Sequence, residues 1–302
     1  MPPLTSPLPR RTVLAGSLAG GAALLSGCSG QAGAAAGPPA ASGVVATGAA
    51  ASGAVSSRPA GTPAASELVS RATVPVLCWH QVREQRASDS KNAKYELVVS
   101  PGNFRAQLDA IKAAGYTSIS PAQYQAHLAE GAALPDKPVL LTFDDGSENQ
   151  ASVALPEVLA RGMTATLFVM TVVIDGGKDW VTGDQITALA GEGITIGSHT
   201  WDHHTVDKLH TEADYETQYV GSRRTLQKLS GQEVTAFCYP GGRWAEAALA
   251  PLRAAGYTIG FQLKETPVSP VDPLMTLRRQ IVVSEWTGKQ IVAQLEQLAG
   301  VR

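Results

Sequence analysis

Two adjacent carboxylates stand where an apolar segment ends. Asp144 and Asp145 directly follow the run 139–143 and precede Gly146, which permits a sharp turn. Two neighbouring acids in such a place can have different roles: one can bind a cation while the other accepts a proton. The same Asp-Asp-Gly run also fits a simple capping turn, so it does not by itself decide between chemistry and structure.

Two histidines follow another apolar segment. The run 194–198 leads into His199, and His203 comes four residues later. Four residues are about one helical turn, so both imidazoles can face one cation. A solvated polar loop is the alternative explanation. A further run, 237–244, reads Phe-Cys-Tyr-Pro-Gly-Gly-Arg-Trp and exposes backbone N–H groups of the kind that hold an oxyanion in acyl transfer.

Apolar runs of strand length alternate with helical patterns along the chain. This alternation predicts an α/β fold with a parallel sheet covered by helices, although the pattern does not separate an open sheet from a closed barrel. The carboxyl ends of parallel strands assemble the site in such folds. The predicted strands are 74–79, 116–120, 139–143, 164–170, 194–198, 235–239 and 257–263, and the predicted helices are 101–114, 121–130, 152–161, 184–191, 212–229, 245–255 and 287–298.

Residues 142–146 together with residues 199–203 resemble the first two signature motifs of the NodB-type polysaccharide deacetylases, carbohydrate esterase family 4. The resemblance covers residues 71–302 and implies a deformed, incomplete (β/α) barrel. It implies that Asp145, His199 and His203 bind a divalent metal. Zinc is the first choice, and cobalt, nickel or another first-row metal also suits these ligands.

The same resemblance implies roles for two further residues. Asp144 would be the general base that deprotonates a metal-held water, and Gly241 would be the oxyanion donor. The sequence departs from the family at Cys238, where an arginine commonly holds the base. We expect Arg279 to hold Asp144 instead, with Arg243 as the second candidate; the alternative is that both are ordinary surface arginines.

A second departure concerns the general acid, which most members supply from a histidine near the carboxyl end. This chain has none there, but His80 ends the early strand. A branch of the family that includes the poly-N-acetylglucosamine deacetylases looks circularly rearranged in this way, so we assign His80 as the general acid. The alternative is an ordinary histidine at a strand end.

Aromatic side chains and two cysteines lie close to these motifs. We predict that Tyr239, Trp201 and Trp244 contact a saccharide, because sugar rings stack on aromatic faces, although such residues are also common in cores. Cys78 and Cys238 can form a disulfide or remain buried free thiols, and the second alternative is preferred.

The amino terminus has the layout of an export signal. Arg10 and Arg11 precede a short apolar run that ends at Cys28, which resembles the lipidated cysteine of bacterial lipoproteins and follows what resembles a twin-arginine signal. We therefore predict an export signal at 1–28, a disordered tether rich in Ala, Gly, Ser and Pro at 29–70, and a catalytic domain at 71–302. A surface arm laid over the domain is the alternative for the tether.

The formal net charge of −2 gives no electrostatic reason to expect nucleic acid as a partner. The resemblance to the deacetylases implies a metal-dependent hydrolase that removes N-acetyl groups from a polysaccharide containing N-acetylglucosamine. From the amino terminus we expect it to be lipid-anchored to the outer face of the cell membrane. An O-acetyl esterase acting on xylan-type polymers and a non-catalytic glycan-binding module remain alternatives.

Overall fold

Seven parallel strands close into a barrel. The computed structural model describes residues 63–263 and 266–300. Around the ring the strands run β1 (Val76–Trp79), β10 (Leu277–Ile281), β9 (Ile259–Leu263), β8 (Ala236–Cys238), β7 (Thr195–Ser198), β6 (Thr166–Val169) and β5 (Pro138–Phe143). The ring closes because β1 pairs with β5 as well as with β10, and the short β4 (Thr117–Ser118) pairs with the amino end of β5 outside the ring. The predicted α/β barrel is confirmed.

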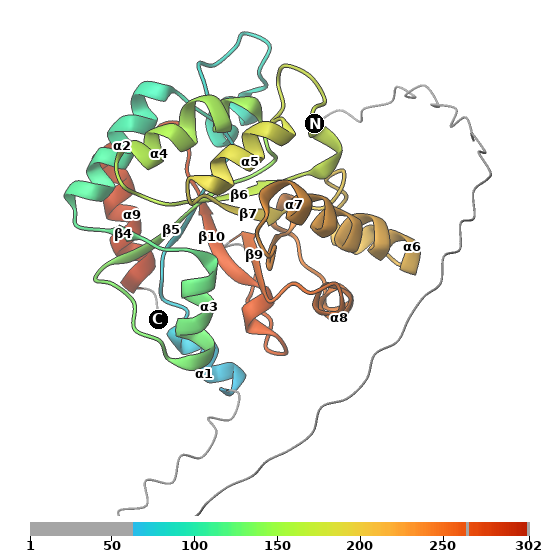
Figure 1. The fold of residues 1–302 in the computed structure, drawn as a ribbon. Coiled ribbons are helices and arrows are strands. Elements are labelled where there is room, and N and C mark those ends of the chain that lie inside the picture. The colour runs from blue at the N-terminus through green and yellow to red at the C-terminus, as the bar shows by residue number, and fades with distance from the viewer. Residues whose placement is uncertain (1–62, 264–265, 301–302) are drawn as a thin grey trace, which may run out of the picture. The chain divides into compact units, whose positions relative to one another are not determined.

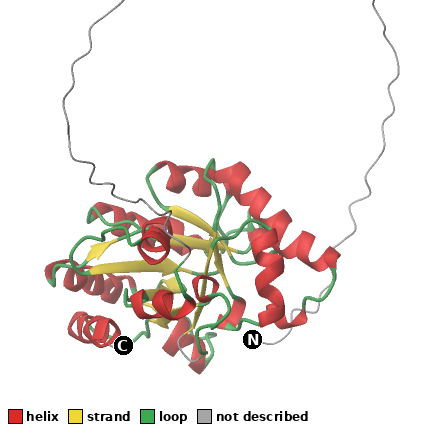
Figure 2. Ribbon diagram, turned by 90° about the horizontal axis from the view of Figure 1, so that it is seen from below, coloured by secondary structure: helices red, strands yellow, loops and turns green. Residues whose placement is uncertain are grey.

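Helices surround this barrel on its outer face (Figures 1 and 2). Each strand leads into a helix or loop that returns the chain to the amino end of the next strand, as parallel pairing requires. Helices α2 and α9 pack side by side, and α1 packs against α3. The helices are α1 (Ala65–Arg71), α2 (Pro101–Ala113), α3 (Pro121–Glu130), α4 (Leu155–Ala160), α5 (Gly183–Gly191), α6 (Glu212–Tyr215), α7 (Ser222–Ser230), α8 (Glu246–Ala254) and α9 (Gly288–Gly300).

Two hydrophobic clusters follow from the alternation of side chains along the strands. One fills the barrel with Val76, Leu140, Phe168 and Phe261, and Tyr124 of α3 also belongs to it. The other lies between the barrel and its helices and contains the alternate strand residues, such as Leu77. Because both faces of the strands are buried, most strand residues are apolar, and the strands hold the polar groups at their carboxyl ends in place.

Several boundaries differ from the sequence prediction. The structure places α1 at 65–71, inside the predicted tether, where Leu68 is buried and joins the barrel cluster. The tether therefore cannot extend to residue 70. Strand β10 was not predicted, because its Leu-Arg-Arg-Gln-Ile sequence carries charged and polar residues. The helix predicted at 212–229 contains a π-helical segment, Glu216–Gly221, between α6 and α7.

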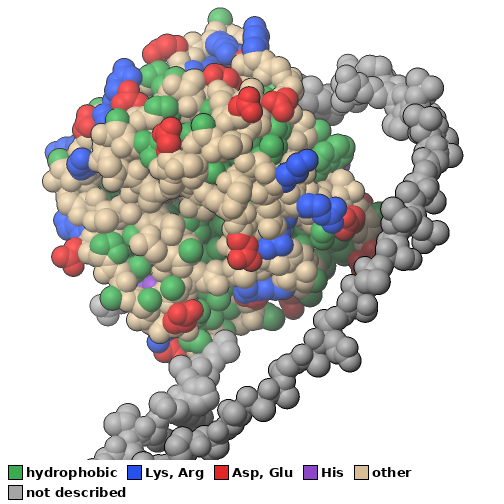
Figure 3. Space-filling model, in the orientation of Figure 1, with side chains coloured by type: hydrophobic (Ala, Val, Ile, Leu, Met, Phe, Trp, Pro, Cys, Tyr) green, Lys and Arg blue, Asp and Glu red, His purple; other side chains and the backbone are tan. Residues whose placement is uncertain are grey.

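The described surface carries charges of both signs. On the face shown in Figure 3, acidic and basic side chains are interspersed. Within the described residues no helix is long and apolar enough to cross a membrane. The predicted signal, Cys28 and most of the predicted tether lie outside the described residues.

Candidate active site

The adjacent acids lie at the carboxyl end of β5, as expected from their sequence position. Asp144 is buried inside the barrel mouth, whereas Asp145 turns outward with a φ of 81°. Gly146 also has a positive φ, and a Cβ at this glycine would lie 3.0 Å from a methyl group of Val169. These two left-handed residues make the turn that separates the carboxylates.

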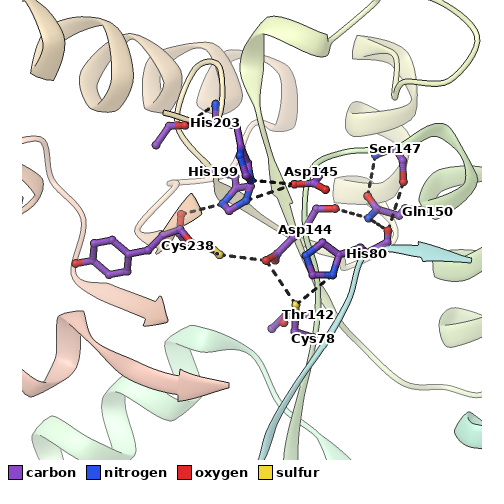
Figure 4. A network of polar contacts seen from close by, with 12 residues as sticks. Cys78, His80, Thr142, Asp144, Asp145, Ser147, Gln150, His199, His203 and Cys238 are labelled. Atoms are coloured by element: carbon purple, nitrogen blue, oxygen red, sulfur yellow. Dashed lines mark hydrogen bonds and ion pairs between the residues drawn. The ribbon is translucent and has the colours of Figure 1, made fainter. Parts of the chain in front are cut away.

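Asp145, His199 and His203 converge at the mouth of the barrel (Figure 4). The Nε2 atoms of both histidines lie 3.5 Å from Oδ1 of Asp145. That oxygen is buried and has no hydrogen-bond partner among the described residues. An unpaired buried carboxylate oxygen between two imidazoles fits a divalent cation, because the cation would supply the missing partner.

The ligand tautomer of His199 is set by a second contact. Its Nδ1 lies 2.9 Å from the carbonyl oxygen of Cys238, so Nδ1–H donates and Nε2 keeps a lone pair toward Asp145. Burial would lower the pKa of His199, but the neighbouring carboxylates raise it overall. Burial lowers the pKa of His203. A proton and a cation therefore compete for the same side of His199.

Arg279 of β10 reaches Asp144 across the barrel interior. Its Nη1 and Nη2 donate to the two carboxylate oxygens of Asp144, each at 2.7 Å. Burial alone would raise the pKa of Asp144, but the Arg279 guanidinium holds it well below its usual range. The second candidate, Arg243, is exposed. Asp144 is thus a fixed, ionised carboxylate.

Two thiols complete the surroundings of Asp144. Sγ of Cys78 and Sγ of Cys238 lie 3.5 and 3.4 Å from Oδ2 of Asp144. Both cysteines are buried and free, so the preferred alternative to a disulfide agrees with the structure. Burial raises the pKa of both thiols, which keeps them protonated as hydrogen-bond donors to the carboxylate. At Cys238, Nη2 of Arg279 donates to the sulfur at 2.8 Å.

His80 lies at the end of β1, beside β5 in the ring. Its Nδ1 is 4.0 Å from Sγ of Cys78, and its ring lies near Asp144 and Asp145 (Figure 4). The side-chain amide of Gln150 donates to the backbone carbonyls of both His80 and Asp144. This amide ties the ends of the two neighbouring strands together.

The remaining predicted residues have different surroundings. Gly241 is exposed and has a φ of 62° in the turn after β8. Trp201 is 40% exposed in the same loop as His203. Trp244 is partly buried, and its Nε1 donates to the carbonyl of Pro267 at 3.0 Å. Tyr239 is 0% exposed, which contradicts the prediction that its side chain contacts a saccharide. It packs edge-on against Phe237 in the outer cluster, because side chains alternate between faces along β8.

Sequence reasoning missed two polar residues at the site. Gln150 lies four residues after Gly146, in the π-helical segment Gln150–Ala154. Thr142 lies within β5, where its hydroxyl accepts from Nη1 of Arg279 at 3.0 Å and donates to the carbonyl of Leu77 at 2.7 Å. A polar residue within an otherwise apolar strand is the signal that could have identified Thr142.

The described residues form a closed parallel α/β barrel with an Asp-His-His cluster at its mouth. The family profile described as polysaccharide deacetylase matches residues 131–260, which include every candidate catalytic, metal-binding and saccharide-binding residue except His80 and Arg279. Residues 131–260 are therefore similar to the polysaccharide deacetylases, and the barrel has the fold of NodB-type deacetylases.

Three known proteins illustrate this similarity. The chain is 28% identical over 227 residues to YxkH of Bacillus subtilis (strain 168), covering 75% of this chain and 77% of that protein. It is 26% identical over 132 residues to the peptidoglycan-N-acetylglucosamine deacetylase of Bacillus cereus, covering 43% of this chain and 46% of that protein. The solved structure of the Streptococcus pyogenes deacetylase PplD in complex with acetate superimposes with a TM-score of 0.67 at 25% identity, covering 74% of this chain and 97% of PplD.

Proposed function

We propose that this protein is a metal-dependent hydrolase that removes N-acetyl groups from a polysaccharide containing N-acetylglucosamine. The observation that carries the proposal is the meeting of three functional groups at one barrel mouth. These are the Asp145, His199 and His203 cluster, the Arg279-bound carboxylate of Asp144, and His80. The named substrate of the Bacillus cereus relative and the acetate bound to PplD support the substrate class and the product.

A divalent cation bound by Asp145, His199 and His203 would polarise the acetamide carbonyl and lower the pKa of a water molecule. Zinc is the first choice for two imidazoles and one carboxylate, and cobalt or nickel also suits this site. Two neutral imidazoles and a single carboxylate leave a net positive charge at the mouth, which favours the developing oxyanion.

The protein's own groups then move two protons. Asp144, held ionised by Arg279, accepts the proton of the water that attacks the carbonyl carbon. The N–H of Gly241 donates to the oxygen that becomes negative. His80 gives a proton to the leaving nitrogen as the C–N bond breaks, so acetate and a free amine form.

Acetate release tests this proposal. The protein is incubated with N- and O-acetylated glycans, with and without added zinc, cobalt or nickel. We expect metal-dependent release from an N-acetylated polymer, with release abolished in Asp144→Asn and strongly reduced in His80→Ala. Release from O-acetylated polymers alone would identify an esterase, and stoichiometric metal with no turnover would identify a glycan-binding module.

We also propose that the chain is exported and lipid-anchored at Cys28 to the outer face of the membrane. The support is the order of Arg10, Arg11, the apolar run and the cysteine. Expression in a bacterial host with labelled fatty acid tests it. Label should enter the wild-type protein and be absent from Cys28→Ser, and equal labelling of the two would refute the anchor.

A further inference from the structure

The loop that carries His203 has a backbone conformation that needs support. Thr200 and His203 both have left-handed φ values, 67° and 68°. For residues with a Cβ this conformation costs about 1–3 kcal/mol each and persists only when surrounding contacts impose it. His203 is also the most exposed of the three proposed ligands, with 36% of its side chain accessible. Contacts from outside the loop must therefore hold this ligand in place.

Gln218 supplies such contacts from another element. It lies in the π-helical segment Glu216–Gly221 and is 6% exposed. Its Oε1 accepts from the backbone N–H of Trp201 at 3.0 Å, and its Nε2 donates to Oδ1 of Asp202 at 2.9 Å. One buried amide thus binds two consecutive residues between the two left-handed positions. π-Helical turns are rare and occur frequently at functional sites.

Asp202, which Gln218 contacts, also contacts the residue after His203. The same Oδ1 accepts from the backbone N–H of His204 at 3.2 Å and lies 2.6 Å from Nδ1 of His204. The backbone N–H of His203 donates to Oγ1 of Thr200 at 3.0 Å. The residues on both sides of His203 are therefore fixed, and Gln218 is the buried group through which helix and loop are joined.

We propose that Gln218 is a positioning residue for the metal site, which sets the affinity of the Asp145, His199 and His203 cluster by holding the His203 loop. This inference rests on the proposed metal ligands but not on the identity of the substrate. It also gives a role to a glutamine amide that is buried next to Tyr219 of the outer cluster.

Gln218→Met tests the inference, because methionine is similar in size and removes both hydrogen bonds without adding charge. Zinc affinity is measured by competition with a chromophoric chelator, and cobalt binding by its visible spectrum. We expect zinc binding to weaken about 10–100-fold, as for other residues that orient metal ligands, and the cobalt spectrum to change. Amide hydrogen exchange should accelerate at residues 200–204, with or without metal.

Gln232→Met is the matched control. Gln232 also binds backbone in two directions, accepting from Ile196 N–H at 2.9 Å and donating to the Ile194 carbonyl at 2.8 Å, but at the amino end of β7, away from the site. We expect this variant to melt at a lower temperature while binding zinc as the wild type does. If Gln218→Met lowers the melting temperature too far, Asp202→Ala removes the partner side of the same contact and should also weaken zinc binding.

The outcomes separate this inference from the proposed function. Wild-type zinc affinity in Gln218→Met, or an equal loss in Gln232→Met, would overturn the positioning role while leaving the deacetylase proposal intact. A wild-type protein that binds no metal would overturn the metal dependence itself. In that case, unchanged exchange at residues 200–204 in Gln218→Met would separately show that the amide does not hold the loop.

Discussion

Arg279 and Asp144 form a buried two-pronged ion pair across the inside of the barrel. Their side chains are 1% and 4% exposed, and both guanidinium–carboxylate distances are 2.7 Å. The two residues lie 135 positions apart in the sequence and on strands that are not neighbours in the ring. The pair fixes the orientation of Asp144, and it also fixes its charge, because either ion alone would be strongly disfavoured in this environment.

Removing the arginine tests this relationship. Arg279→Ala should lower turnover by orders of magnitude and destabilise the fold by about 3–5 kcal/mol, because Asp144 is left as an unpaired buried charge. Bound metal should remain near wild-type content, because Arg279 does not contact the three proposed ligands. Turnover, urea unfolding and metal analysis on the same preparation would check this. Arg243→Ala, at an exposed arginine, is the control, and its turnover, stability and metal content should match the wild type. Normal turnover in Arg279→Ala would show that Arg279 has no role at the site.

Gln150 connects the proposed acid and base through their backbone carbonyls. Gln150→Met should lower kcat by about 100-fold, because a small displacement of either group is enough to cost that much. KM and metal content should change little, since Gln150 contacts neither the proposed metal ligands nor the exposed mouth. Steady-state kinetics would separate the two parameters. A change in KM alone would show that Gln150 shapes substrate binding instead.

The predicted saccharide contacts Trp201 and Tyr239 differ in solvent exposure, so their substitutions should have different effects. Trp201 is exposed in the loop of the proposed ligand His203 and should contribute stacking of about 1 kcal/mol. Trp201→Phe should therefore change KM little, and Trp201→Ala should raise KM about fivefold with kcat preserved. Tyr239→Phe should leave both parameters unchanged, because the ring is buried and its hydroxyl has no hydrogen-bond partner among the described residues. A larger effect at Tyr239 than at Trp201 would contradict this assignment.

The loop after β1 contains a titratable contact. The side chain of Arg83 and the backbone N–H of Arg86 lower the pKa of Asp89 to about 2. Because this folded pKa lies below the ordinary value, the contact stabilises the fold above about pH 4 and is lost as the pH falls toward 2. Asp89→Asn should therefore cost about 1 kcal/mol or less at pH 7, and the cost should shrink below pH 4. Urea unfolding of the wild type and the variant at pH 7 and at a pH below 4 would measure this cost.

Asp179→Asn is the control for this measurement. Asp179 pairs with Arg86 on the surface at 3.5 Å, with both side chains more than half exposed, so a smaller loss at pH 7 is expected. If the loss of unfolding free energy in Asp89→Asn stays constant down to pH 2, it does not depend on the charge of Asp89. The loss would then come from a difference in hydrogen bonding between the carboxyl group and the asparagine amide.

The location of the acids and histidines followed from the sequence alone. Asp144, Asp145 and His199 each come directly after an apolar run, and a fully buried parallel strand requires such a run. Their place at the carboxyl edge was therefore a local property of the chain. The same reasoning predicted the six strands other than β10 in the ring, because their runs are apolar on both faces.

Tertiary structure decided which distant groups meet those residues. The sequence of β10 is too polar to predict a strand, yet β10 completes the ring. Only this closed ring brings Arg279 to Asp144 and aligns β1 with β5. Tertiary structure also decided the burial of Tyr239, which depends on which face of β8 points toward the helices. It likewise decided the burial of Leu68 in α1, which packs into the barrel cluster. A buried charge or side chain is stabilised by partners far away in the sequence, and the ring order that selects those partners is not a property of any local segment.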